Sequence, residues 1–356
     1  FYLWLSGPVS DRPTIGQRLT ALDVGPLERS FIIFVLFVCV IVCLVFVYTV
    51  LSSSTVGALL SIASLVSDSS LLEARKAITA GSDGYFAPGY VKQFRDILVP
   101  VLLISMMAIS TRYRQRPIVW VSFSVAIFAM AITGQRLILV VFFLALLLGS
   151  YLIRHNNPAQ PVSRSRGLPI LLGLAGILFV YGFISVWLGR VVQDSPADQL
   201  VLGVFVNLLD RVFLAAPREN LATMTYWYAM GPTLGQSWLS DLAGILPGVD
   251  QAFSNVLHAR TGGSIQGNSP LGLAPDTWLA WGWPGLVIAP FLFAIFVGAV
   301  DRALSLSRSP VLFGAHIYLF VVLPICYSPY LFILYGGAVA LILFAAILAI
   351  RSRRFW

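Results

Sequence analysis

Residues 117–149 read PIVWVSFSVAIFAMAITGQRLILVVFFLALLLG, two apolar runs separated by Gly134, Gln135 and Arg136. Each run is close to the roughly 20 residues that a helix needs to cross the hydrocarbon core of a bilayer. The pattern predicts a membrane hairpin whose tight turn carries Arg136. A charge near lipid is costly unless it is paired or reaches the interface, which favours a functional role for this arginine. The alternative is an interfacial anchor at a helix end.

The composition of the whole chain agrees with a membrane protein. Its 356 residues are 58% hydrophobic and only 11% charged, a balance that water-soluble domains rarely reach because they must also cover their own surface. We therefore expect an all-α polytopic membrane protein. The apolar runs predict about eight transmembrane helices, at 31–51, 92–111, 117–134, 137–153, 168–189, 284–300, 310–327 and 329–350.

The distribution of basic residues predicts the orientation, because short loops rich in Lys and Arg stay in the cytoplasm. Basic clusters follow every second predicted span. Together with residues 1–30, that side holds 14 of the 23 basic residues and four of the 15 acidic ones. The net charge of +8 is therefore a topology signal. A nucleic-acid partner, which would need a clustered basic face on a folded domain, is not indicated.

This topology divides the chain into four regions. They are a cytoplasmic segment 1–30, transmembrane helices within 31–189 with an extracytoplasmic loop at 67–91, a large extracytoplasmic loop at 190–280, and transmembrane helices with a cytoplasmic tail at 281–356. The first residues, FYLWLS, resemble the end of another apolar span, so we expect an earlier helix to be missing.

The long loop 190–280 is the expected catalytic region, because a segment of this length is rarely a passive connection. Within it, residues 200–214 place apolar side chains on one helical face and Asn207, Asp210 and Arg211 on the other. This pattern predicts a short amphipathic helix that lies in the membrane interface.

Arginine predominates among the basic residues of the extracytoplasmic side. Its planar fork binds phosphate oxygens in pairs, which indicates a lipid-linked phosphate or diphosphate as ligand. Anionic headgroups and salt bridges to acidic residues are the alternative. We expect no metal site, because the three histidines are scattered and the carboxylates form no D-x-D pair. The arginines are Arg75, Arg95, Arg136, Arg190, Arg211, Arg218 and Arg260.

The order of several motifs resembles the Wzy-type O-antigen or oligosaccharide repeat-unit polymerases. The motifs are EARKAITAGSDGY at 73–85, TGQR at the hairpin turn, NLLDRVFLAAPREN at 207–220, GPTLGQSWLSDLAGILPG at 231–248 and GNSPLGLAPDTWLAWGWPG at 267–285. The resemblance implies a GT-C-like fold in the bacterial inner membrane, with an active site that faces the periplasm. It also implies transfer of a glycan from undecaprenyl diphosphate to another lipid-linked repeat unit, without a cofactor. A chain-length regulator protein and membrane lipids are candidate partners.

The resemblance also implies site residues. It assigns Arg75, Arg136 and Arg211 to positions where the family has arginines, and Asp276 to an acidic position that is often Glu in the family. We expect the three arginines to bind diphosphate and Asp276 to act as the base, with His258 or Glu219 as alternative bases. Further substrate-binding candidates are Gln135, Arg218, Glu219, His258, Arg260 and Trp278, although a tryptophan next to a span is more often an interfacial anchor.

The sequence also allows three other functions. An O-antigen ligase would share the architecture and the donor but would transfer glycan to a lipid A core. A lipid-linked oligosaccharide flippase would need a polar path through the bilayer, and the predicted spans contain almost no internal charge. A non-enzymatic assembly subunit would have no requirement for a particular arginine.

Overall fold

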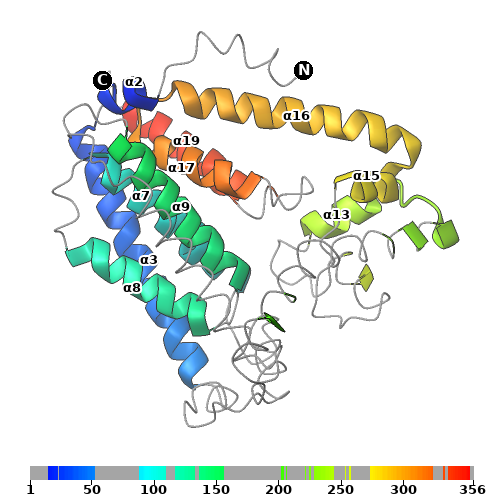
Figure 1. The fold of residues 1–356 in the computed structure, drawn as a ribbon, viewed down its shortest axis with the longest axis horizontal. Coiled ribbons are helices and arrows are strands. Elements are labelled where there is room, and N and C mark those ends of the chain that lie inside the picture. The colour runs from blue at the N-terminus through cyan, green and yellow to red at the C-terminus, as the bar shows by residue number, and fades with distance from the viewer. Residues whose placement is uncertain are drawn as a thin grey trace.

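The computed structural model describes residues 15–22, 24–52, 88–109, 117–132, 136–155, 202–203, 206, 221, 224–225, 228–243, 253, 256–257, 273–323, 332 and 336–352. These residues form helices and the turns between them, with no strand among them (Figure 1). The helices are α2 (Ile15–Thr20), α3 (Pro26–Ser52), α6 (Pro88–Lys92), the π-helix η2 (Gln93–Leu98), α7 (Val99–Ile109), α8 (Pro117–Ile132), α9 (Arg136–His155), α13 (Gln236–Ala243), α15 (Leu273–Trp281), α16 (Trp283–Leu306), α17 (Pro310–Val322) and α19 (Ala338–Ser352).

The prediction of an all-α protein is confirmed for the described residues. Among the described residues, two helices, Pro26–Leu51 and Trp283–Leu306, are long and apolar enough to cross a membrane. Helices also occupy the other predicted spans, except 168–189, which lies outside the described residues. Helix α19 overlaps the second half of the last predicted span, 329–350, and continues to Ser352. That all of these helices cross the bilayer stays a prediction, as does the GT-C fold.

The core of the bundle is formed where α7 packs between α17, α9 and α3, with α8 against α3. The contact between α7 and α17 is close because Gly314 has no side chain. A Cβ atom at Gly314 would lie 2.3 Å from the carbonyl oxygen of Val101 and 2.5 Å from Oγ of Ser105. Small residues at helix interfaces bring backbones together in this way in membrane bundles.

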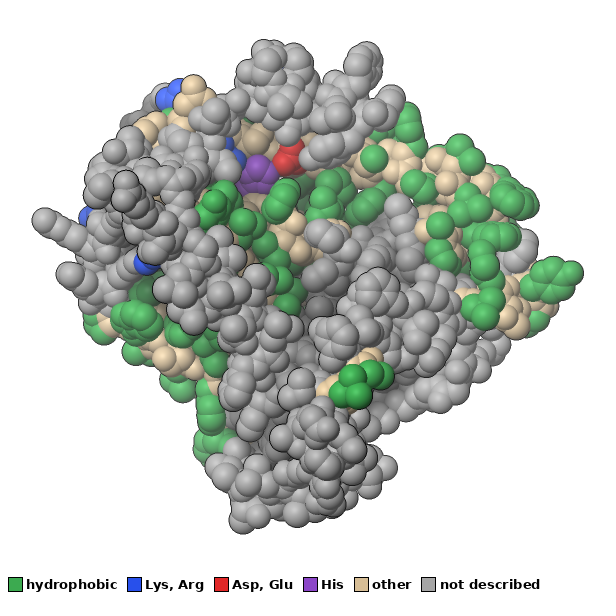
Figure 2. Space-filling view, viewed as in Figure 1, with side chains coloured by type: hydrophobic (Ala, Val, Ile, Leu, Met, Phe, Trp, Pro, Cys, Tyr) green, Lys and Arg blue, Asp and Glu red, His purple; other side chains and the backbone are tan. Residues whose placement is uncertain are grey.

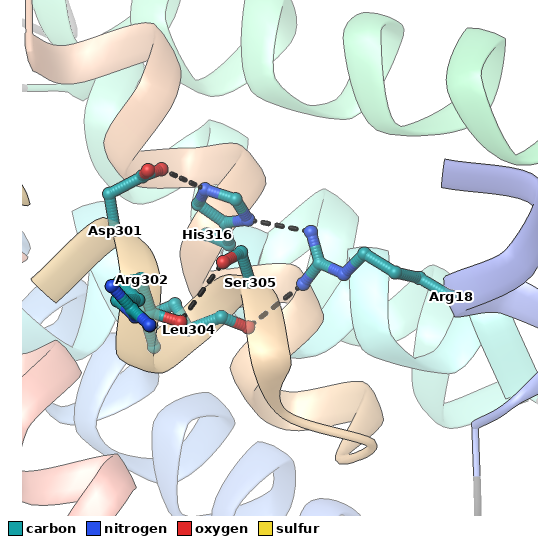
Figure 3. Close-up of polar contacts among 6 residues, drawn as sticks. All are labelled: Arg18, Asp301, Arg302, Leu304, Ser305 and His316. Carbon is teal, nitrogen blue, oxygen red and sulfur yellow. Dashed lines mark hydrogen bonds and ion pairs between the residues drawn. The ribbon is translucent and has the colours of Figure 1, made fainter. Parts of the chain in front are cut away.

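A polar cluster joins α2, α16 and α17 at one end of the bundle (Figure 3). Nε2 of His316 lies 2.7 Å from Oδ1 of Asp301, and its Nδ1 lies 2.8 Å from Nη1 of Arg18. Arg18 also donates from Nη2 to the carbonyl oxygen of Leu304 over 2.9 Å and lies over the ring of Phe313. Burial lowers the pKa of Arg18 to about 10, and the charge of Asp301 opposes this shift. Arg18 therefore stays charged at neutral pH.

A second cluster lies where α3, α17 and α19 meet. Glu28 is fully buried at the start of α3; it accepts a short hydrogen bond from Ser309 and a bond of 3.2 Å from Nη2 of Arg351. The two clusters bring the starts of α3 and α17 together with the ends of α16 and α19. The predicted topology places these same four helix ends on one side of the membrane. That this side is the cytoplasmic one stays a prediction.

Helix α16 extends away from the other long helices, and α15 and α13 lie beside its first turns (Figure 1). Its surface near α15 is apolar, with exposed Val287, Ile288, Phe291 and Leu292. Figure 2 shows hydrophobic side chains along α16 and around α13 and α15. An exposed apolar surface on a long apolar helix is typical of contact with lipid. The start of α16, and α15 with it, therefore lies away from the two polar clusters.

Candidate active site

Only some of the predicted site residues lie within the described residues. Asp276 and Trp278 are described with their side chains on α15, and Arg136 is the first residue of α9. Helix α9 therefore begins where the sequence predicts the end of the hairpin turn. The remaining candidates lie outside the described residues: Arg75, Gln135, Arg211, Arg218, Glu219, His258 and Arg260. Their grouping with Arg136 or Asp276 stays a prediction.

The turn before α13 joins α13 to the end of α15. Its backbone N–H groups at Thr233 and Gly235 donate to the carbonyl oxygens of Leu279 and Ala280, both over 2.9 Å. An α-helix leaves its last four carbonyls without partners inside the helix, and Leu279 and Ala280 belong to that set. The turn therefore satisfies the end of α15 and holds α13 in a fixed register against it.

Three glycines allow α13, α15 and α16 to meet closely. Gly235 has φ +84°, and a Cβ atom there would lie 2.4 Å from Cζ2 of Trp281. Gly285, in the first turn of α16, would place a Cβ atom 2.2 Å from the carbonyl oxygen of Thr277. The φ of +66° at Gly282 turns the chain between α15 and α16. The sequence thus requires glycine where α13, α15 and α16 meet.

Asp276 is buried at this junction. Its Oδ2 accepts a hydrogen bond of 3.1 Å from Nε1 of Trp238, and the buried carboxylate of Asp241 lies near it. Burial and, to a smaller extent, the negative charge of Asp241 raise the pKa of Asp276, the bond from Trp238 opposes both, and the resulting pKa is about 7. A carboxyl group with this pKa exists in both protonation states at neutral pH, so it can take up and release a proton.

Four tryptophan side chains form two ring contacts at the junction of α13, α15 and α16. Trp238 and Trp281 make an edge-to-face contact at 6.3 Å between ring centroids, and Trp278 and Trp283 lie 5.2 Å apart. Trp281 and Trp283 are exposed, at 44% and 68%, whereas Asp276 is 5% exposed. The junction therefore offers apolar ring faces at the surface beside a buried acid–base group. Such ring faces can stack on sugars or lie in the membrane interface.

Sequence analysis did not identify Asp241 and Trp238 as site residues. They lie three residues apart on α13, a spacing that places two side chains on the same helical face. The spacing was visible in WLSD at 238–241, but nothing in the sequence pairs this face with Asp276, 35 positions further on. That pairing depends on the docking turn at Thr233 and Gly235.

The assignment of Arg95 needs a correction. The sequence placed it among the arginines available to a phosphate, but the structure buries it to 1% exposure, with Asp96 as its ion-pair partner. The carboxylate of Asp96 accepts the paired hydrogen bonds that the Arg95 guanidinium would otherwise donate to a phosphate. Arg95 is therefore not available as a phosphate ligand. Within the described residues, His, Cys, Asp and Glu side chains form no group of three that could hold a metal ion.

No protein-family model, curated protein or solved structure matches the chain. The resemblance to repeat-unit polymerases therefore depends on the order of the sequence motifs.

Proposed function

We propose that the chain is a glycosyltransferase of the bacterial inner membrane that polymerises oligosaccharide repeat units. It transfers a growing glycan from undecaprenyl diphosphate to another lipid-linked repeat unit on the periplasmic face. The observation that supports this proposal best is the carboxyl group of Asp276, which is buried beside Asp241 and has a pKa of about 7. Titratable groups with strongly perturbed pKa values are concentrated at functional sites.

The proposed reaction needs one base. The hydroxyl oxygen of the acceptor sugar attacks the anomeric carbon of the donor and forms the new glycosidic bond. The bond from that carbon to the diphosphate oxygen breaks, and undecaprenyl diphosphate leaves with the electron pair. Asp276 takes the proton of the hydroxyl. A base whose pKa is close to the working pH suits this step, because it is ionised before the reaction and still basic enough to accept the proton.

The leaving diphosphate needs positive charge. In the proposal Arg136, Arg75 and Arg211 supply it, and Arg218 and Arg260 add to it. Fixed cations that face a developing negative charge stabilise it without reorganisation of the surroundings. Arg136 suits this role because it lies at the start of α9, where the hairpin turn meets the extracytoplasmic surface in the predicted topology.

Trp278, Trp281 and Trp283 are the proposed sugar-binding surface. Trp281 and Trp283 expose their rings at the junction of α15 and α16, close in sequence to Asp276. Aromatic faces hold sugar rings through their apolar C–H surfaces, and this would bring a hydroxyl towards the base. Gln135, Glu219 and His258 remain secondary candidates for contacts with the glycan.

The test of this proposal is polymer formation in a bacterial strain that lacks its own polymerase and receives the matching repeat unit. The parent chain, Arg136→Ala and Arg211→Ala are compared at equal membrane expression, and the lipopolysaccharide or capsule is separated by length. Arg29→Ala, an exposed arginine of the predicted cytoplasmic side, is the control. The parent and the control should give a ladder, and the two variants should leave single repeat units.

A parent chain that makes no ladder would contradict the polymerase proposal. Glycan attached to a lipid A core without polymerisation would indicate an O-antigen ligase instead. Accumulation of repeat units at the outer face without any transfer would indicate a flippase. If both arginine variants give the same ladder as the parent, Arg136 and Arg211 are not part of the site.

A further inference from the structure

The buried ion pair of Arg95 and Asp96 lies in the π-helix η2, directly before α7. Nε of Arg95 donates to Oδ1 of Asp96 over 2.5 Å, and Nη2 donates to Oδ2 over 3.1 Å. Neighbouring side chains do not face each other on an α-helix. In the π-helix η2 the two side chains are nevertheless bonded to each other, and short π segments inside helices are frequent at functional sites.

Arg95 also contacts two other helices. Its Nη1 donates to the carbonyl oxygen of Ala129 on α8 over 3.1 Å, and its guanidinium lies 5.3 Å from the ring centroid of Phe46 on α3. Ala129 is in the last turn of α8, whose carbonyls have no partners within the helix and carry the negative end of the helix dipole. Arg95 therefore binds the end of α8 through a hydrogen bond to the carbonyl of Ala129 and through the attraction of its positive charge to the negative end of the helix dipole.

The end of α8 is connected closely to the start of α9. Helix α8 ends at Ile132 and α9 begins at Arg136, so few residues separate them. Met130 of α8 and Leu139 of α9 are buried in one cluster with Val99 of α7. A displacement of the last turn of α8 would therefore be transmitted to the first turn of α9.

We propose that Arg95 is a positioning residue for Arg136. Through its bond to Ala129 it fixes the end of α8, and through α8 it fixes the place where α9 presents Arg136 to the diphosphate. This inference depends on the proposed function, since it assumes that Arg136 binds diphosphate. Arg95 itself does not contact the substrate in this account, because Asp96 occupies its fork and its side chain is buried.

The experiment measures binding of undecaprenyl diphosphate to the purified chain in nanodiscs of phosphatidylethanolamine and phosphatidylglycerol. The main variant is Arg95→Met/Asp96→Leu, which removes both charges together. Replacing a buried ion pair by apolar residues of similar volume is often neutral for stability, whereas removing one partner is not. The second variant is Arg95→Lys, which keeps the charge but loses the planar fork.

Arg18→Met is a matched control. Arg18 is also a buried arginine that donates to a carbonyl in the last turn of a helix, Leu304 of α16, over 2.9 Å, and it lies 5.2 Å from the ring centroid of Phe313. Unlike Arg95, Arg18 lies in the polar cluster of α2, α16 and α17, with Asp301 and His316. Its replacement should affect the stability of the fold but leave diphosphate binding unchanged.

The double variant should weaken diphosphate binding at least about tenfold, since small displacements of a binding group are costly. Arg95→Lys should raise the KM for the lipid-linked donor more than it lowers kcat. A general loss of folded protein would instead lower the active fraction and leave KM unchanged. If the double variant does not fold, the donor KM of Arg95→Lys decides, and a value equal to that of the parent overturns the inference.

The result that overturns the inference is parental diphosphate binding by the double variant while Arg136→Ala binds at least about tenfold more weakly. The proposed role of Arg136 would survive that result. Parental binding by Arg136→Ala has a different meaning, because it removes the diphosphate account and the positioning inference together. The two failures are therefore distinguishable.

Discussion

Trp238 on α13 donates its indole N–H to the carboxylate of Asp276 on α15 over 3.1 Å. This bond joins two segments that are 38 positions apart, and it acts on the same carboxylate that burial and Asp241 make harder to ionise. The junction of α13 and α15 therefore sets the protonation state of the proposed base. Changes on α13 should consequently alter the chemistry of Asp276 without touching α15.

The first prediction concerns the indole donor. Trp238→Phe keeps an aromatic ring but removes the hydrogen bond that lowers the pKa of Asp276, so this pKa should rise above about 7. Because the base must be ionised, the transfer rate should rise with pH through this pKa. In Trp238→Phe the rising limb of the pH–rate profile should therefore move to higher pH. Trp281→Phe, which changes the ring in edge contact with Trp238, is the control. The account fails if both variants shift the limb equally.

The second prediction concerns the neighbouring carboxylate. Asp241→Asn removes a negative charge that raises the pKa of Asp276, so the rising limb of the pH–rate profile should move to lower pH. The measurement is the initial rate of the proposed glycan transfer against pH for the purified protein. A limb that stays in place would mean that Asp241 does not act on the proposed base.

The third prediction links Asp276 to stability. Its pKa is higher in the folded chain, at about 7, than the ordinary value of 3.8, so the folded state holds the proton more strongly. Its contribution to stability is therefore fully present below about pH 4 and is lost as the pH rises through about 7. Thermal unfolding midpoints measured between these values should fall more steeply for the parent than for Asp276→Asn. Equal slopes would contradict the raised pKa.

The fourth prediction separates backbone strain from steric conflict. Gly231 and Gly235 both have positive φ, but a Cβ atom at Gly231 meets nothing within 4 Å, whereas one at Gly235 would lie 2.4 Å from the ring of Trp281. Gly235→Ala should therefore cost about 1–3 kcal/mol more than Gly231→Ala through overpacking. Protease sensitivity of the α13–α15 junction and thermal unfolding would measure the difference. Equal effects would show that the close contact is relieved without cost.

The helices were predictable because long apolar runs have few alternatives in a membrane. The start of α9 at Arg136 agrees with the break after residue 133 that the sequence places between two runs. The π-helix at Gln93–Leu98 was not predictable, since the apolar pattern of 92–111 does not distinguish one helical period from another. The sequence also places Arg95 among the arginines of the extracytoplasmic surface, whereas the structure buries it and pairs it with Asp96.

The site was predictable in part. The motif around residues 267–285 identified Asp276, but its burial and its partners come from contacts between segments far apart in the sequence. Asp241 and Trp238 belong to a short helix whose docking depends on backbone hydrogen bonds from Thr233 and Gly235. Tertiary contacts of this kind leave no periodic signal, so the sequence indicated Asp276 as the proposed base but not its neighbours Asp241 and Trp238.

The central proposal is that this chain transfers glycan with Asp276 as the base, and the most direct measurement is glycan transfer by the purified protein in nanodiscs. Lipid-linked repeat units are supplied, and the lengthened product is quantified with the undecaprenyl diphosphate released. The account predicts one diphosphate released per linkage by the parent. It predicts a rate lower by about 10²-fold or more for Asp276→Asn, with donor binding unchanged. Parental rates from Asp276→Asn, or no lengthened product from the parent, would contradict it.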